Sequence, residues 1–371
     1  MALWAFFALT GATTALLGAP VAPALLELRK RTDAAPLPTS QHNGKITNFA
    51  EVFSTQIELL RPKLRQCADD KEIVRSRTGN IEVLLVGHER IDLGLDPLRG
   101  LTALMCSDSA TILAGRTVDA DVYTERTLYL GPRAVLRAGV SSGDILLDQD
   151  SAVLRWLHAR NSVYLKCGSS AYGRLSADVL IHLQAGCGFQ HMHAPNIHTI
   201  ARQDFADPAG AGCSCSFSHS TCHICEIDLN QRHDSANSQD IFANYRRRIR
   251  KQGDFLLPAH QTLNADIVAT GAVRFGPGSR FMGSTKSYKD TFVDEGACIH
   301  GSLVCGGTLY LGERSSVTGP VMAEEDVFIA SGARAGRADA LTTVAARHVQ
   351  IATGCELHGT VRARVRGVVE S

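Results

Sequence analysis

The sequence has few aromatic residues and almost no net charge. Phe, Trp and Tyr make up 6% of its 371 residues, and 38 Lys and Arg stand against 37 Asp and Glu. The balanced charge gives no argument for a nucleic-acid partner. The scarcity of aromatics, together with 33 glycines, favours a narrow aliphatic core with many tight corners over a large catalytic cleft.

Several motifs of the common enzyme classes are also missing. The sequence contains no Gly-x-x-x-x-Gly-Lys-Ser/Thr phosphate loop, no His-Glu-x-x-His zinc motif and no Gly-x-Gly-x-x-Gly dinucleotide loop. We therefore expect a protein without enzymatic activity.

Cysteine is present, but not in the arrangement of a disulfide framework. The count of 11 is odd, and disulfide frameworks are typical of short secreted chains. Most cysteines outside one cluster stand alone, and we expect them to be small buried apolar residues in a reducing compartment. They are Cys67, Cys106, Cys167, Cys298, Cys305 and Cys355.

The N-terminal segment is long and apolar. Residues 1–26 carry no charge, and residues 27–31 contain three basic side chains. A helix of ~20 apolar residues crosses a bilayer, and a basic flank stays on the cytoplasmic side. The sequence therefore predicts a transmembrane anchor over residues 1–31, single-pass in the inner membrane, with the C-terminal region cytoplasmic. The alternative is a signal peptide cleaved near residues 22–24.

An 18-residue repeat runs through residues 267–336. Apolar residues recur at fixed phases and alternate with polar residues, as they do in strands. The apolar columns are Val273, Thr291, Leu309 and Val327; Phe275, Val293, Leu311 and Ile329; and Phe281, Ile299, Val317 and Ala335. The glycine columns are Gly278, Gly296 and Gly332, with Arg314 as the exception, and Gly283, Gly301 and Gly319. The pattern predicts an all-β fold, a β-solenoid or β-helix with ~18 residues per coil.

The final coil keeps the same columns at a longer spacing. Val349 follows Val327, and Ile351 follows Ile329, each four positions later than the period would place it. We expect the extra residues to lie within 337–343, where a corner can loop out without disturbing the stack.

The same period is present nearer the N-terminus. Ile145, Val163 and Ile181 share one phase, and Leu147, Leu165 and Leu183 share another. The sequence therefore predicts a first solenoid block over residues 77–193 and a second over residues 263–371.

Two segments lie outside the repeats. Residues 32–76 are predicted to be a linker and a short helix that begins near Asn48, ends at Pro62 and packs as a lid on the nearest coil. Such a lid would hide an exposed edge strand. Residues 194–262 have no period and are predicted to be an irregular insertion.

The insertion carries a candidate metal site. From His182 to His233, 52 residues hold 7 of the 14 histidines and 5 of the 11 cysteines. Two close cysteine pairs would supply the four thiolates that tetrahedral zinc prefers, and the metal would order a loop without a core. The predicted ligands of this structural zinc are Cys213, Cys215, Cys222 and Cys225. Because the spacing is not that of a common zinc finger, the alternative is a Cys-rich loop without a ligand.

A basic run follows the cysteine cluster. Residues 246–251 contain five positive charges. In a tethered protein this run would contact anionic lipid headgroups; the alternative is a solvated linker.

The C-terminal strand is the predicted site of self-assembly. Residues 360–366 alternate between apolar and basic side chains, and five residues follow. A solenoid ends in an open strand edge unless it is capped. We expect Val361, Ala363 and Val365 to extend the apolar core into a second copy of the chain.

The second block resembles the bactofilin family of bacterial polymer-forming cytoskeletal proteins. Three segments carry the resemblance: Gly271-x-Val273-x-Phe275-Gly276-Pro277-Gly278, Gly301-Ser302-Leu303-Val304 and Leu309-Tyr310-Leu311-Gly312. The resemblance covers residues 263–371 and, more weakly, 77–193. It implies a right-handed β-helix that polymerises end to end without nucleotide, at the membrane, as a scaffold for cell-envelope enzymes.

The leading hypothesis is therefore a non-enzymatic, membrane-tethered scaffold. Its expected partners are further copies of itself, the membrane and cell-envelope synthesis proteins, without nucleic acid. The alternative is a β-helix acyltransferase or envelope-polysaccharide enzyme, since the coils of hexapeptide-repeat acyltransferases have the same length as this repeat. An aliphatic residue at every sixth position is not maintained, however: Ile267 and Val273 are followed by Ser279, Thr285 and Thr291.

Overall fold

The computed structural model describes residues 4, 7–13, 46–78, 81–87, 90–93, 102–201 and 248–370. The chain divides into two units, Met1–Lys45 and Ile46–Ser371. In the first unit, residues 7–13 are helical. Within the described part of the chain, no helix combines the length and the apolar character that a membrane crossing requires. Most of the predicted anchor, residues 1–31, lies outside the described residues.

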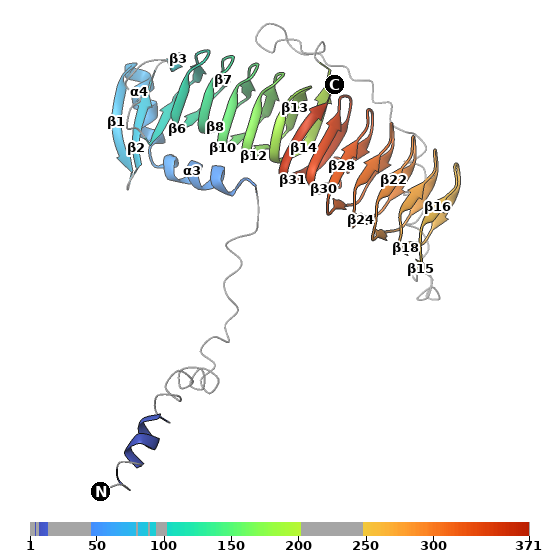
Figure 1. The fold of residues 1–371 in the computed structure, drawn as a ribbon. Helices are drawn as coiled ribbons and strands as arrows, with labels where there is room; N and C mark the ends of the chain where they lie inside the picture. Colours follow the sequence, from blue (N-terminus) through green and yellow to red (C-terminus); the bar gives the residue numbers. More distant parts are fainter. Residues whose placement is uncertain are drawn as a thin grey trace, which may run out of the picture. The chain divides into compact units, whose positions relative to one another are not determined.

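The second unit is a β-solenoid of about 13 turns, so the all-β prediction is confirmed. Two helices come first, α3 (Asn48–Glu58) and α4 (Arg61–Asp70), and strands follow to the end of the described chain (Figure 1). The strands form two stacks of coils. In the sequence, the first stack precedes residues 202–247 and the second follows them.

The first stack contains β1 (Ile73–Thr78), β2 (Ile81–Val86), β3 (Arg90–Leu93), β4 (Ala103–Cys106), β5 (Ser109–Ile112), β6 (Thr117–Thr124), β7 (Leu128–Leu130), β8 (Val135–Ser141), β9 (Ile145–Leu147), β10 (Ala152–Ala159), β11 (Ser162–Leu165), β12 (Ser170–Ala177), β13 (Leu180–Gln184) and β14 (Gly188–Ile200).

The second stack contains β15 (Arg248–Lys251), β16 (Phe255–Leu257), β17 (Thr262–Asn264), β18 (Asp266–Ala269), β19 (Val273–Phe275), β20 (Arg280–Met282), β21 (Thr285–Ser287), β22 (Thr291–Val293), β23 (Cys298–His300), β24 (Leu303–Cys305), β25 (Leu309–Leu311), β26 (Ser316–Val317), β27 (Val321–Ala323), β28 (Asp326–Ile329), β29 (Arg334–Ala335), β30 (Thr342–Ala352) and β31 (Glu356–Glu370).

Each coil pairs in register with the next, because the sequence period equals the length of one coil. The parallel strands β19, β22, β25 and β28 place Phe275, Val293, Leu311 and Ile329 opposite one another. These four side chains are at most 2% exposed, which confirms the predicted inward column. Burial of each such side chain stabilises the fold by roughly 1.5–3 kcal/mol.

The outward residues of the same strands form an aromatic ladder. The rings of Phe292, Tyr310 and Phe328 are stacked, with centroids 4.9 and 5.1 Å apart. This spacing is close to the ~4.8 Å between neighbouring strands. Because the rings face one another, the ladder stabilises the pairing of successive coils and leaves mainly the ring edges in contact with solvent.

Glycines occupy the corners for two different reasons. Gly296 and Gly332 have φ values of 64° and 72°, and Arg314, at the same phase, has a φ of 54°; this left-handed conformation favours glycine. At position 301, glycine is needed because the preceding coil leaves no room for a side chain. A Cβ on Gly301 would lie 2.0 Å from the carbonyl oxygen of Gly283 in the preceding coil.

The wider last coil has its extra residues in a corner, as the sequence predicts. Val349 on β30 opposes Val327 on β28, although the spacing between them exceeds the period by four positions. Between β29 and β30, Arg337 and Ala340 form an isolated antiparallel bridge that closes the loop without shifting the column.

The two stacks meet at their C-terminal coils. Successive coils within each stack are parallel, but β14 pairs antiparallel with β31, for example through Met192 and Val361. Both side chains are buried at 1% exposure or less. The apolar core therefore continues from one stack into the other through a reversal of strand direction.

The regular structure extends further than the predicted domain boundaries. Residues 194–200 belong to β14, and residues 248–257 already form β15 and β16, so both ends of the predicted insertion 194–262 are strands. The sequence hides them for a physical reason. No described strand follows β14 one period later, and β15 is dominated by charged side chains.

Helices α3 and α4 cover one outward face of the first stack. Phe53 and Ile57 on α3 and Leu64 on α4 are buried, and the ring of Phe53 lies 5.3 Å from that of Trp156 on β10. The lid packs on the coils as the sequence predicts, with two differences. The edge of the end strand β2 is paired with β1, while α4 packs against one face of β2. In addition, Pro62 lies in the first turn of α4, where proline is tolerated, instead of ending the helix.

We expect Gly301→Ala to destabilise the protein by roughly 1–3 kcal/mol, because the new methyl group would force two coils apart. The matched control is Gly296→Asn, since nothing lies within 4 Å of a Cβ there and asparagine tolerates a positive φ. Thermal unfolding followed by circular dichroism measures both. Equal losses for the two variants would contradict the distinction between the two glycine columns.

Candidate functional site

Hydrogen bonds of polar side chains stabilise the junction between the stacks, in addition to the pairing of β14 with β31. His193 Nδ1 on β14 lies 2.9 Å from Thr360 Oγ1 on β31. Thr199 Oγ1 donates a hydrogen bond of 2.7 Å to the carbonyl oxygen of Ala352 and accepts one of 2.9 Å from the backbone N–H of Cys355. Because these groups are satisfied, their burial costs little, and the junction is a specific contact between two particular coils.

Two arginines and a histidine form a row across this junction, which we call the basic row. Arg174 on β12 opposes His191 on β14, which opposes Arg362 on β31. The row begins where the helical lid ends. Trp156 precedes Arg174 in the row and packs beneath the lid, and the Arg174 guanidinium lies 4.1 Å from the ring centroid of Phe49 at the start of α3.

The electrostatics of the basic row are unfavourable for another positive charge. Burial, together with Arg362 and Arg174, lowers the pKa of His191 below its usual value. Like charges directly opposite one another on adjacent strands are destabilising. The row is therefore suited to an anionic group, such as a phosphate or a carboxylate, that guanidinium groups bind with charge-assisted hydrogen bonds.

A second outward face carries stacked aromatic and imidazole rings. Tyr164 on β11 stacks on His182 on β13 with 5.1 Å between centroids, and His182 meets His198 on β14 edge to face at 5.6 Å. Burial, with His198 beside it, lowers the pKa of His182 to about 4. Burial also lowers the pKa of His198, although Glu356 opposes this change.

No described strand covers the outer edge of the first coil of the second stack. Among the described strands, β15, β16 and β17 pair only with the next coil, through β18, β19 and β20. Ile249, Phe255 and Leu263 are half-buried and pack against the end of the core. This coil, β15–β17, therefore combines an open strand edge with an incompletely covered apolar core.

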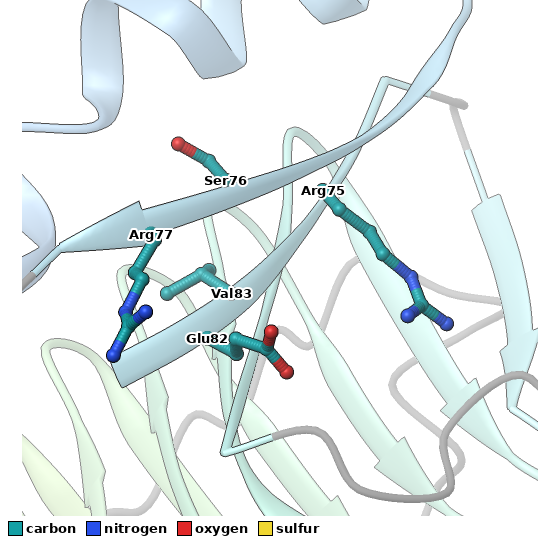
Figure 2. A pocket seen from close by; sticks show the side chains of 5 residues that line it. All are labelled: Arg75, Ser76, Arg77, Glu82 and Val83. Atoms are coloured by element: carbon teal, nitrogen blue, oxygen red, sulfur yellow. The ribbon is translucent and has the colours of Figure 1, made fainter. Parts of the chain in front are cut away.

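The opposite end, at the start of the first stack, is closed by the hairpin β1–β2. A shallow pocket of about 180 Å³ there is lined by Arg75, Ser76, Arg77, Glu82 and Val83. Figure 2 shows Arg75, Arg77 and Glu82 on one side of the hairpin and Ser76 on the other. Charged side chains on an edge strand discourage pairing with another chain, although Ile73 and Val74 on the same strand are 53% and 36% exposed.

The sequence also contains one Gly-x-Ser-x-Gly match, residues 139–143. Its serine, Ser141, is fully buried, and the hydroxyl donates a hydrogen bond to the carbonyl oxygen of Arg126. A catalytic serine in this motif is exposed on a strand-to-helix turn, whereas Ser141 stabilises a corner between β8 and β9.

The single cysteines lie mainly in the core, as the sequence predicts. Cys106, Cys305 and Cys355 are buried and free, whereas Cys167 and Cys298 are partly exposed. Burial raises the pKa of Cys106 to about 12 and those of Cys305 and Cys355 to about 11. A thiol with so high a pKa is a poor nucleophile, so these residues contribute packing.

The C-terminal edge predicted to join a second copy is occupied by the same chain. Val361 and Ala363 are 1% and 0% exposed, because β31 pairs with β14. Val365 lies outside the paired positions and is 50% exposed. The free edge on which that prediction depended does not exist at the C-terminus. The sequence placed part of β14 in the insertion and so missed its partner.

Sequence analysis did not identify Arg174, His191 or Arg362 as a group. The parallel repeat offers a weak signal for Arg174 and His191, since the spacing between them is one position shorter than the period. Arg362 has no such signal. Its place in the row follows from the antiparallel junction, which no repeat encodes.

No family model, curated protein or solved structure matches the chain. The resemblance to bactofilins consequently stays a prediction that depends on the three segments of the second block.

We expect acidification to destabilise the protein, and His182 to be a main cause. Its folded pKa of about 4 lies below the unfolded value of ~6.5, so the unfolded state binds the proton first. Stability should be complete above about pH 6.5 and decrease by on the order of 3 kcal/mol as the pH falls to about 4.

Thermal unfolding of wild type and His182→Phe at several pH values measures this dependence. The phenylalanine keeps a ring against Tyr164 and should flatten the profile, whereas His260→Asn, at an exposed position, should leave it unchanged. An unaltered acid slope in His182→Phe would show that other groups cause the loss.

The proposed zinc ligands Cys213, Cys215, Cys222 and Cys225 lie outside the described residues. Among the described residues, no group of three or more His, Cys, Asp or Glu could hold a metal ion. If the prediction is right, the purified protein contains about one zinc per chain, and Cys222→Ser loses it without affecting the solenoid. Mass spectrometry of the purified protein measures its metal content. A metal-free protein in which these four thiols titrate freely would contradict the prediction.

Proposed function

We propose that the protein is a non-enzymatic, membrane-tethered scaffold that self-associates through its uncapped coil, β15–β17. In this role the solenoid provides a long rigid surface along which proteins of cell-envelope synthesis are organised. The observation that carries the proposal is the difference between the two ends of the stacked coils.

One end carries charged side chains, and no described strand covers the other. At the charged end, the hairpin β1–β2 presents Arg75 and Arg77. At the other end, Phe255 and Ile249 pack on the core but stay half-buried. A strand edge beside exposed apolar core is a template for another chain, and pairing with a second copy would bury these side chains and satisfy the free backbone groups.

The form of the assembly depends on which ends meet. If the coils β15–β17 of two copies pair with each other, the contact is self-complementary and gives a closed two-fold dimer. If the coil β15–β17 of one copy pairs with the β1 end of the next copy, the contact can repeat and gives a filament. The filament contact brings Arg75 and Arg77 towards Arg250 and Lys251 of β15. The expected homopolymer therefore requires that these like charges be screened by salt or neutralised by an anionic surface.

The tether belongs to the same proposal. Residues 1–26 are uncharged, and residues 27–31 are mainly basic, which favours a single pass through the inner membrane with the solenoid on the cytoplasmic side. A right-handed β-helix, as the bactofilin resemblance implies, completes the proposal.

We expect Phe255→Asp to abolish self-association, because a carboxylate would have to be buried at the contact. Leu256→Asp is the matched control: its side chain is on the same strand, 61% exposed, and points away from the core. Light scattering of the full chain in detergent, over a range of concentrations, measures the mass, and circular dichroism checks that both variants remain folded.

A wild-type chain that is monomeric at every concentration would contradict the proposal. So would an equal effect of the two substitutions, since a contact through the end of the core involves Phe255 and not Leu256.

A further inference from the structure

A ridge of the solenoid next to the basic row exposes apolar side chains on adjacent strands. Leu154, Tyr172 and Val365 are 48%, 57% and 50% exposed. The strand register places the first two at the bulged corners of β10 and β12. Gln190, at the same corner of β14, donates a hydrogen bond of 3.4 Å to the carbonyl oxygen of Val365, which places the backbone of Val365 beside this corner.

Arginines flank these apolar residues. Arg362 and Arg174 belong to the basic row, and Arg364 lies between Arg362 and Val365, with its guanidinium donating to the carbonyl oxygen of Glu324. None of the three arginines forms an ion pair with a carboxylate among the described residues. We call Leu154, Tyr172, Val365, Arg174, Arg362 and Arg364 the junction patch.

The composition of the junction patch favours one kind of partner. A soluble polyanion would use the arginines but would leave the apolar side chains exposed to water. A bilayer surface uses both, because guanidinium groups bind phosphates while tyrosine and aliphatic side chains enter the boundary between headgroups and acyl chains. Tyrosine is enriched at this depth in membranes.

The position of the patch agrees with a membrane partner. The chain enters the second unit at α3, whose Phe49 lies under the guanidinium of Arg174. The segment that precedes α3 includes the apolar stretch 1–26. The proposed tether is therefore connected in the sequence, through residues 27–45, to the helix that contacts Arg174.

We propose that the junction patch is a second membrane contact, which binds the phosphate headgroups of anionic lipids. The contact goes beyond the proposed tether: the tether holds the chain at any bilayer, whereas the patch orients the solenoid on an anionic one. It rests on the proposed function only in assuming that the solenoid faces the cytoplasmic leaflet, which is the anionic side.

The test uses a full-length chain whose tether is disabled by Leu16→Asp and Leu17→Asp, since carboxylates in the apolar stretch oppose insertion. Binding to vesicles of phosphatidylcholine, with and without phosphatidylglycerol, is measured by co-sedimentation. We expect this chain to bind only the anionic vesicles, and to be released by salt.

Substitution then separates the patch from general surface charge. Arg362→Gln with Arg364→Gln should weaken binding roughly 30-fold, at about 1 kcal/mol for each arginine. The control is Arg274→Gln with Arg314→Gln, which changes the charge equally at side chains that are 60% and 69% exposed. Circular dichroism confirms that each variant is folded.

A second pair of variants distinguishes a bilayer from a soluble polyanion. Tyr172→Ser with Val365→Ser should weaken binding to anionic vesicles, whereas Tyr288→Ser with Val304→Ser, at comparably exposed positions, should not. If the tether-disabled chain ignores anionic vesicles, or the arginine pair behaves like its control, the proposal is wrong. Equal binding to heparin, with no effect of the Tyr172 and Val365 changes, would also overturn it, in favour of a polyanion.

The tether is judged separately, by comparing wild type with the tether-disabled chain on neutral vesicles. If wild type fails to bind there, the proposed tether fails, and the result with anionic vesicles still decides the patch.

Discussion

Backbone hydrogen bonds between successive coils hold the solenoid together, and they form because the chain returns to the same phase after a constant number of residues. A shift of one residue in a single coil would turn its inward side chains outward. The constraint therefore acts on every coil at once. It explains why the longer last coil places its extra residues in a corner, where Arg337 and Ala340 meet, while Val349 still opposes Val327.

The same constraint makes the ends of a stack important, because each end leaves one row of backbone groups unpaired. The chain treats its ends in three ways. A charged antiparallel hairpin closes the start of the first stack, the two C-terminal coils close each other, and the coil β15–β17 stays open in the described part of the chain. Among the described residues, the coil β15–β17 is therefore the end at which strand pairing would also cover half-buried apolar core, whereas the β1 edge carries arginines.

The reversal of direction at the junction also brings together side chains that a parallel repeat would keep apart. Arg362 comes to lie opposite His191, and Thr360 opposite His193. The helical lid covers Trp156 and its Phe49 stacks against Arg174, whereas Arg362 on β31 stays exposed. Burial lowers the pKa values of His191, His193 and His198, so the contact that joins the two stacks also sets the electrostatics of this surface.

The sequence by itself determined the interior of each stack. Period and alternation identified the column from Phe275 to Ile329, the corner glycines and the wider last coil, because these features depend on neighbours one coil away, and that distance is written in the spacing of residues. The left-handed backbone of Arg314 could not be predicted from its residue type, because the position in the corner imposes this conformation.

Only the tertiary structure decided where the stacks begin, end and meet. The antiparallel pairing of β14 with β31 joins residues that are far apart in the sequence, for example Met192 and Val361, and it follows from the complementarity of two particular coils rather than from a repeat. For this reason the sequence predicted a free strand edge at the C-terminus and did not predict the basic row. A periodic sequence specifies contacts along the stack, whereas contacts between its ends depend on surfaces that occur once.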